Sequence, residues 1–248
     1  MSTNYDDIAE EYKRSKLQPW RQYIEAFTLF ELAVDLACKP VLDLACGEGF
    51  YTRLLRQKGA GRAVGVDLSA GMINLALEEE ARRPLGIDYL HRDVKKLYLN
   101  ETFDLVFAAY LLNYAQTKEE LIEMCQAIAK HLKPGGRFVS INLYPDYTGA
   151  TDSMRKYGFT REATASVEGT PITLIFEGDG TSFEITNYYL SIPTHERAFG
   201  EAGLRDLRWH PPRVAPKGLA EYGADFWDDF LEFNPVICLE CEKGHGAD

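Results

Sequence analysis

Apolar residues along the chain follow two different periods, which predict short strands separated by helices. Five short apolar runs have the length of buried strands, at residues 40–45, 63–66, 87–90, 103–108 and 137–143. The segments between them place apolar residues at helical spacing, over residues 50–58, 69–82 and 118–132. Strands that alternate with helices predict a parallel sheet with helices on both faces.

The two ends of the chain have other patterns. The first forty residues predict two helices, over 6–16 and 22–37. After Tyr144 the alternation fades, and the pattern predicts a hairpin of strands 172–177 and 183–190 joined by a turn at 178–180. The remaining predicted elements are a helix over 194–202, closing strands over 204–209 and 236–242, and a loop or loop-helix insert over 211–234.

Composition and charge narrow the classes of partner. The chain has 248 residues, a net charge of −11 and a pI of about 5.0. That charge repels nucleic acid and anionic membrane surfaces. Residues 1–20 lack a basic start followed by an apolar run, and no uninterrupted apolar stretch reaches spanning length. We therefore expect a cytoplasmic protein that binds neither nucleic acid nor membrane, and we leave its oligomeric state open.

Five scattered cysteines give no disulfide framework or metal motif. Cys238 and Cys241 form a C-x-x-C, but they fall on a predicted strand. Residues three apart on a strand point to opposite faces, so this pair is a poor metal clamp. We predict no metal site.

The first predicted strand ends in a glycine-rich turn that leads into a helix. Gly47 and Gly49 lack Cβ, so a ligand can lie against the backbone from Ala45 onward. Thr52 stands where a dinucleotide fingerprint has its third glycine. Asp43, just before the turn, disfavours a pyrophosphate but suits an ammonium group. These features favour S-adenosylmethionine over NAD as the cofactor.

Acidic residues also follow the next two strands. Asp67 lies twenty positions after Gly47, where a carboxylate can accept both ribose hydroxyls; Leu68 follows it. Asp93 can take the exocyclic amine of adenine, and the N–H of Val94 can address a ring nitrogen. Met72 is placed either to flank the adenine or to pack in the core.

The fourth predicted strand ends where the methyl group of a bound S-adenosylmethionine would lie. Ala109 and Tyr110 end it, and we expect Ala109 to contact the cofactor and Tyr110 to line the methyl-transfer site. Asn113 and Tyr114 either line the substrate site or fix the loop. His210, beside two prolines, is either a general base or a structural histidine.

In this order and spacing, the motifs at 41–49, 65–69, 91–94, 103–110 and 132–138 resemble the class I S-adenosylmethionine-dependent methyltransferase superfamily. The resemblance implies a seven-stranded, mostly parallel Rossmann-like sheet whose last strand is antiparallel. The segment Tyr5–Tyr12 is similar to the lid helix of the small-molecule branch, where the second tyrosine, here Tyr12, covers the cofactor. Residues 5–21, 111–115 and 226–227 are similar to toxoflavin-type N-methyltransferases.

We interpret the chain as a single domain, 1–248, with a helical lid at 1–39, a cofactor-binding core at 40–144 and substrate-side strands with an insert at 145–248. Aromatic residues are dense in the last part and predict a pocket for a planar substrate. The candidate substrate-binding residues are Asn113, Tyr144, Tyr188, Trp209 and Trp227.

The predicted reaction is methyl transfer from S-adenosylmethionine to a nitrogen, oxygen or sulfur of a small, planar aromatic or heterocyclic molecule. A base is optional for a neutral amine and needed for a hydroxyl of high pKa. The alternatives are a protein that binds the cofactor or its product without turnover, and a NAD-dependent oxidoreductase.

Overall fold

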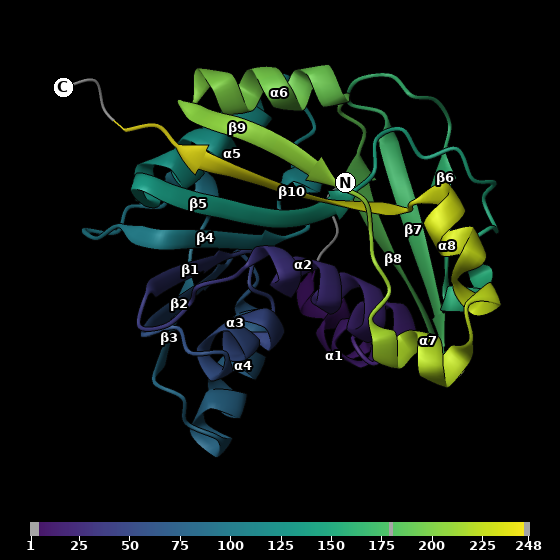
Figure 1. Ribbon diagram of the computed structural model, residues 1–248, viewed down its shortest axis with the longest axis horizontal. Coiled ribbons are helices and arrows are strands. Elements are labelled where there is room, and N and C mark those ends of the chain that lie inside the picture. The colour runs from purple at the N-terminus through teal and green to yellow at the C-terminus, as the bar shows by residue number, and fades with distance from the viewer. Residues whose placement is uncertain (1–4, 179–180, 246–248) are drawn as a thin grey trace.

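The computed structural model of the protein describes residues 5–178 and 181–245. A seven-stranded sheet with the order β3-β2-β1-β4-β5-β10-β9 forms its centre (Figure 1). Its strands are β1 Pro40–Leu44, β2 Arg62–Asp67, β3 Ile87–His91, β4 Phe103–Ala109, β5 Leu132–Leu143, β9 Leu204–His210 and β10 Val236–Lys243. β1 to β5 pair in parallel, and β10 runs antiparallel to both β5 and β9. This confirms the predicted fold class.

Helices cover both faces of the sheet, as Figure 1 shows. Alternate strand residues explain why: Leu42 and Val106 pack with the helices of one face, and Val41 and Phe107 pack with those of the other. The flanking helices are α3 Phe50–Gln57, α4 Ala70–Arg82, α5 Lys118–His131 and α6 Ile192–Glu201. Strands β1, β2, β4 and β5 therefore have buried side chains on both faces, whereas the edge strand β3 buries only Ile87 and Tyr89, on one face.

The N-terminal segment differs from the sequence prediction. α1 covers Tyr5–Ser15 as expected, but the predicted helix over 22–37 is wrong in extent. In its place, a π-helix, η1 Arg21–Ala26, runs directly into the short helix α2 Phe27–Leu32. The helix ends at Leu32 because Ala33, with a ψ of 58°, leaves the helical region, and Asp35 and Cys38 beyond it adopt positive φ.

A second, three-stranded antiparallel sheet lies beside the main one, in the order β6-β7-β8 (Figure 1). β7 Pro171–Gly178 and β8 Thr181–Tyr188 are the predicted hairpin, whose turn falls mainly on residues outside the described ranges. β6 Phe159–Ala163 was not predicted. The predicted insert after β9 holds α7 Pro216–Tyr222 and α8 Asp228–Phe233.

Short 3₁₀ turns complete the chain, at η2 Val94–Lys96, η3 Leu112–Tyr114, η4 Arg155–Tyr157 and η5 Asp225–Trp227. The Pro-Gly-Gly sequence at 134–136 predicts a turn before the fifth strand, but these residues lie inside β5. β4 pairs with β5 at Leu132 and again from Arg137 on, and Gly135 between them has a φ of 72°. The turn is therefore an irregularity that the strand absorbs.

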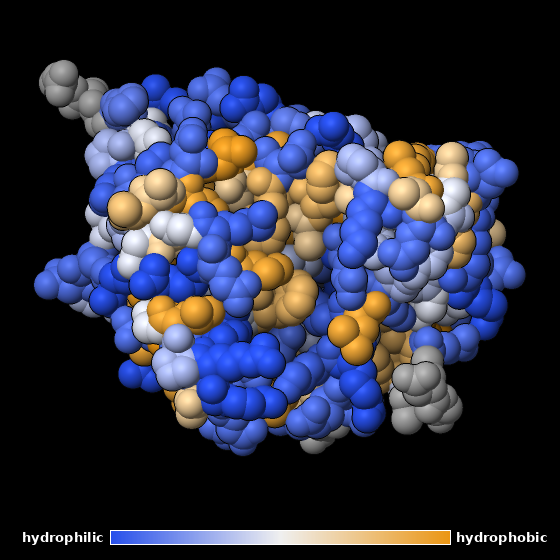
Figure 2. Space-filling model, turned by 60° about the horizontal axis from the view of Figure 1, so that its bottom comes forward, coloured by the Kyte–Doolittle hydropathy of each residue, from blue (hydrophilic) through white to orange (hydrophobic). Residues whose placement is uncertain are grey.

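The surface is mostly hydrophilic, in keeping with the high net charge. One face carries a hollow bordered by hydrophilic residues, in which apolar side chains gather (Figure 2). Among the described residues, no helix is long and apolar enough to cross a membrane.

Candidate active site

The glycine turn after β1 leaves open space above its backbone. Gly47 has a φ of 56°, and a Cβ built on it would meet no atom within 4 Å. Gly49 also has a positive φ, but a Cβ there would collide with the Tyr89 ring. We predicted that both glycines keep the backbone open to a ligand, and only Gly47 has that open space. Gly49 is needed for packing. Ala45, with a φ of 57°, starts the turn.

Asp67, at the end of β2, is held by the same turn. The N–H of Gly47 donates to one of its carboxylate oxygens and the N–H of Ser69 to the other, both at 2.8 Å. Burial raises the pKa of Asp67, and these backbone hydrogen bonds oppose that effect. Each oxygen keeps a free lone pair, so the carboxylate can still accept two ribose hydroxyls.

The residues expected around the adenine differ in how far they are buried and in whether their polar atoms are free. Met72 is buried beside the α4 N-terminus, whereas Leu68 is 68% exposed. Asp93 caps η2 by accepting the N–H of Lys95 at 2.9 Å, so one of its oxygens is already used. Val94 is buried in the core. The four lie along the edge formed by the ends of β2 and β3.

Asp43 is fully buried beside the turn and accepts the hydroxyl of Thr52 at 2.6 Å. Thr52, which replaces a fingerprint glycine, therefore orients a site acid. Burial raises the pKa of Asp43 to about 7, and the Thr52 hydrogen bond opposes the shift. Asp43 is thus about half ionised at neutral pH.

This pKa predicts a pH-dependent cofactor affinity. An ionised Asp43 attracts the ammonium group of S-adenosylmethionine and a protonated one does not, so the affinity should rise several-fold from pH 6 to pH 7.5. Calorimetric titration at both pH values measures it. In Asp43→Asn the rise should shrink; a rise of undiminished size in that variant would contradict the assignment. The pKa values of Glu48 and Asp67 are also raised, so the ionisation of these two residues can account for the part of the rise that persists in Asp43→Asn.

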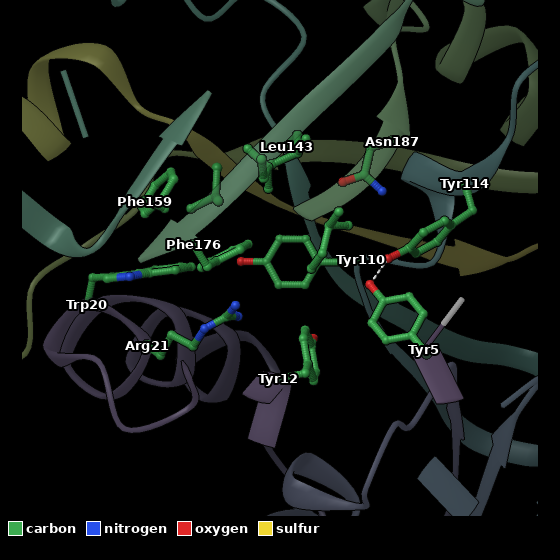
Figure 3. A pocket seen from close by; sticks show the side chains of 13 residues that line it. Tyr5, Tyr12, Trp20, Arg21, Tyr110, Tyr114, Leu143, Phe159, Phe176 and Asn187 are labelled. Atoms are coloured by element: carbon green, nitrogen blue, oxygen red, sulfur yellow. Dashed lines mark hydrogen bonds between the residues drawn. The ribbon is translucent and has the colours of Figure 1, made fainter. Parts of the chain in front are cut away.

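Helix α1, the segment expected to form a lid, packs against the N-terminal end of α4. Asp6 accepts the Ser69 hydroxyl and the Gly71 N–H, which fixes α1 on the N-terminus of α4. Tyr5 shares a hydrogen bond with the Tyr114 hydroxyl, shown dashed in Figure 3. The ring of Tyr12 stands edge-on to Tyr5, at 5.3 Å between centroids.

A cavity lies between α1 and the carboxyl ends of β4 and β5 (Figure 3). Its empty volume is about 370 Å³, of which about 20 Å³ is open to the centre of a water molecule. Aromatic rings form much of its wall, and aliphatic side chains of the second sheet close it. It is lined by Tyr5, Tyr12, Trp20, Arg21, Tyr110, Tyr114, Leu143, Phe159, Leu174, Phe176, Ile185, Asn187 and Val236. The wall is therefore mainly apolar and aromatic, and the guanidinium of Arg21 and the amide of Asn187 are among its polar groups.

A buried ion pair stands at one side of this cavity, and the sequence analysis missed it. Arg21 and Glu25 are 2% and 0% exposed, and Nη1 of Arg21 lies 3.1 Å from the Glu25 carboxylate. Glu25 also accepts the hydroxyls of Tyr51 and Tyr110. Lys16 lies 3.6 Å from it. The available signal was the spacing of Arg21 and Glu25, which are four apart in a helix.

Charges around Glu25 decide its ionisation. Burial raises the pKa of Glu25, but Arg21 and Lys16 lower it more, so the net pKa lies below its ordinary value. Burial, and then the negative charge of Glu25, raise the pKa of Tyr110 well above its usual range. The Tyr110 hydroxyl is therefore neutral and donates to Glu25, which makes it a poor general base. Its ring still faces the cavity (Figure 3).

Several candidate residues lie elsewhere. His210 contacts Glu240 at 3.1 Å in a cluster with Arg137 and Arg208, and it does not line the cavity. The geometry does not support it as the base. Trp209 packs edge-on against His195 on the other face of the sheet. Trp209 and His210 are neighbours on β9 and point to opposite faces of the sheet, and the sequence does not indicate what either face contacts.

Trp227 is 0% exposed, stacks on Tyr157 and donates its indole N–H to the Gly218 carbonyl. It is a core residue and does not line the cavity. Asn113, Tyr144 and Tyr188 line a smaller adjoining pocket, and Asn113 accepts the N–H of Leu143 at 3.2 Å. Asn113 therefore fixes the loop after β4, one of the two roles considered for it. Ala109 ends β4 at the cavity side of the main sheet.

No group of three or more histidine, cysteine, aspartate and glutamate residues in the described ranges could hold a metal ion. Cys238 and Cys241 are buried on opposite faces of β10, where each packs in a different core cluster. The two thiols do not converge.

The known proteins that this chain is similar to are methyltransferases. Residues 41–136 match the profile of a methyltransferase domain family. The chain is 25% identical to the N-demethylindolmycin N-methyltransferase of Streptomyces griseus over 216 residues, 84% of this chain and 90% of the relative. It is 33% identical to the cypemycin N-terminal methyltransferase of a Streptomyces species over 127 residues, but spans only about half of that relative's length: 51% of this chain and 49% of the relative.

A solved structure agrees over nearly the whole chain. The CcbJ methyltransferase of Streptomyces caelestis superposes with a TM-score of 0.66 at 21% identity, and the match covers 98% of each chain. This likeness includes both ends of the chain, beyond the region that the family profile matches.

Proposed function

Because this chain is a class I S-adenosylmethionine-dependent methyltransferase, we propose that it methylates a nitrogen of a small, planar heterocyclic molecule. The single observation that carries the proposal is the narrow, aromatic-walled cavity at the carboxyl ends of β4 and β5. The relative from Streptomyces griseus, whose name describes N-methylation of demethylindolmycin, supports the choice of acceptor atom.

The residues around the turn fit the cofactor. Gly47 leaves the backbone accessible, Asp67 presents two oriented oxygens for a ribose, and Asp43 places a carboxylate near the turn. Tyr12, on α1, lines the cavity and would cover the bound cofactor. When bound, S-adenosylmethionine supplies a methyl group on a positively charged sulfur, which needs no further activation.

The chain's own residues align the acceptor and keep water out. Flat rings such as Tyr110 and Phe176 can hold a planar molecule between them, and the aliphatic wall of the second sheet excludes solvent. Burial, and then the charge of Glu25, keep the Tyr110 hydroxyl neutral, and His210 lies away from the cavity. An acceptor nitrogen with a free lone pair needs no base, whereas an alcohol does.

Incubation with S-adenosylmethionine and matched pairs of acceptors tests the proposal. Each pair shares a bicyclic scaffold and carries either a pyridine-type ring nitrogen with a free lone pair or a hydroxyl of high pKa, and mass spectrometry follows product and S-adenosylhomocysteine together. We expect transfer to the nitrogen acceptors only. Transfer to the hydroxyl acceptors would refute the N-acceptor assignment. Cofactor binding without transfer to any acceptor of the panel would favour the non-catalytic alternative.

Tyr110→Phe is a matched variant for the same assay. It keeps the ring and removes only the hydroxyl, so the pH profile of turnover should not change if Tyr110 is a wall of the site and not a base. Loss of an ionisation from that profile would assign proton transfer to Tyr110 instead.

A further inference from the structure

Arg161, on β6, is a buried cation without an acidic partner in the described part of the chain. It is 5% exposed, and its Nη1 and Nη2 both donate to the carbonyl of Tyr144 at 3.2 Å. Its guanidinium lies 4.3 Å from the centroid of the Tyr147 ring. Nε is buried without a hydrogen-bond partner among the described residues. The proposed methyl transfer does not use this residue.

The position of Arg161 is unusual for a charged side chain. It pairs in register with Leu174, so the two share the face of the second sheet that closes the cavity. Neighbouring residues on that face are apolar, including Phe159 and Ile172. Burial lowers the pKa of Arg161 to about 10, and only Tyr147 opposes the shift. A buried charge is costly unless it is paired, and one carbonyl and one ring offset this cost only in part.

The Arg161 side chain lines a pocket that is separate from the cavity. The empty volume of this pocket is about 590 Å³, of which about 180 Å³ is open to the centre of a water molecule. Exposed hydroxyl residues form its outer side, namely Thr151, Thr164 and Ser166. The tyrosines Tyr147 and Tyr189 flank it. A cation inside, hydroxyl donors outside and access to solvent are the elements of an anion site.

Three acidic residues carry charges near the tyrosines of this pocket. Asp152 affects the pKa of Tyr147, and Asp146 and Glu168 affect that of Tyr189, all by their charge. None of the three forms an ion pair with Arg161. The positive charge in the pocket is therefore not neutralised by these residues.

We propose that the pocket of Arg161, Thr151, Thr164 and Ser166 binds an oxyanion, either a free phosphate or a carboxylate or phosphate group carried by a larger ligand. Guanidinium recognises such groups through paired N–H donors, and the hydroxyls complete the shell. This inference does not depend on the proposed methyl acceptor.

Titration with inorganic phosphate, at constant ionic strength maintained with chloride, tests the site. We expect saturable binding with a Kd of about 1 mM by calorimetry. Arg161→Gln should weaken it by about tenfold or more, because the charge-assisted hydrogen bonds are lost. The matched control is Arg155→Gln, which removes the same charge from an exposed arginine paired with Glu177 and should change Kd less than about twofold.

A second measurement covers the case in which Arg161→Gln does not fold. In the wild-type protein, backbone amide signals of residues 164–166 should shift in NMR spectra as phosphate saturates, while those around Arg155 stay in place. The double surface variant Thr164→Val with Ser166→Ala should weaken binding without touching the buried side chain. Absence of saturable shifts at 164–166, or equal effects of the Arg161 and Arg155 variants, would overturn the proposal.

The source of the anion is distinguished in the methyl-transfer assay. Phosphate that raises the KM for the acceptor, and not for S-adenosylmethionine, would mark the pocket as a subsite for an anionic group on the acceptor. Phosphate that binds without changing either KM would mark it as a site for a free anion.

Discussion

Replacing Asp67 with alanine is expected to weaken the binding of S-adenosylhomocysteine by about 100-fold. A carboxylate that accepts two ribose hydroxyls contributes charge-assisted hydrogen bonds, each of about 1.5–3 kcal/mol when lost. The same carboxylate holds the N–H groups of Gly47 and Ser69, so its removal also loosens the turn that carries the cofactor. Calorimetric titration of the variant and the wild type measures the loss.

The control for this prediction is Asp88→Ala. Asp88 lies on β3, its side chain is 56% exposed, and it pairs with Arg62 at the surface. Its removal takes away the same charge but no site contact, so affinity should stay within about twofold. Equal affinities of wild type and Asp67→Ala, with both proteins folded, would remove Asp67 from the cofactor site. Binding of NAD by the wild type would revive the dinucleotide alternative.

Glu25→Ala should lower the free energy of unfolding by about 3–5 kcal/mol. The variant leaves Arg21 buried without its counter-ion and removes the acceptor of the Tyr51 and Tyr110 hydroxyls. Because both charges lie in a dry environment, the loss of one partner costs more than a surface pair contributes. Urea unfolding followed by circular dichroism measures the change.

Two further variants separate the causes of that loss. Glu25→Gln keeps an acceptor for the hydroxyls and should lose less stability than Glu25→Ala. Glu31→Ala removes an acid whose side chain is 48% exposed and that pairs with Arg213, and it should change stability by less than about 0.5 kcal/mol. If Glu25→Ala and Glu31→Ala had equal effects, the buried cluster would not stabilise the fold as argued.

Local sequence features were sufficient for the central sheet. The five apolar runs became β1 to β5, and the glycine turn with its flanking acids lies at the carboxyl ends of those strands. The period of apolar residues specifies which face of each strand is buried, so these elements follow from neighbours a few residues apart. Asp43, Gly47 and Asp67 come together because β1 and β2 are adjacent parallel strands.

Local patterns failed where a residue's role depends on a distant partner. Trp227 and Tyr110 are both aromatic and near an element end, yet one is core and the other lines the cavity. His210 is adjacent in sequence to two prolines but is held by Glu240 from another strand. The strand β6 was missed because its apolar face is interrupted by Arg161, whose burial nothing in the sequence indicates.

The sequence by itself determined the order of strands and helices, the glycine turn and the acidic residues at the strand ends, because these depend on backbone conformation and on periodicity over short distances. Only the tertiary structure decided which rings form the cavity wall, how Arg21 and Glu25 neutralise each other inside it, and where Arg161 is left without an acid. The surroundings of these groups depend on segments that are distant in the sequence, such as Tyr110, which is 85 residues from Glu25 and donates its hydroxyl to it, and only the folded chain brings such segments together.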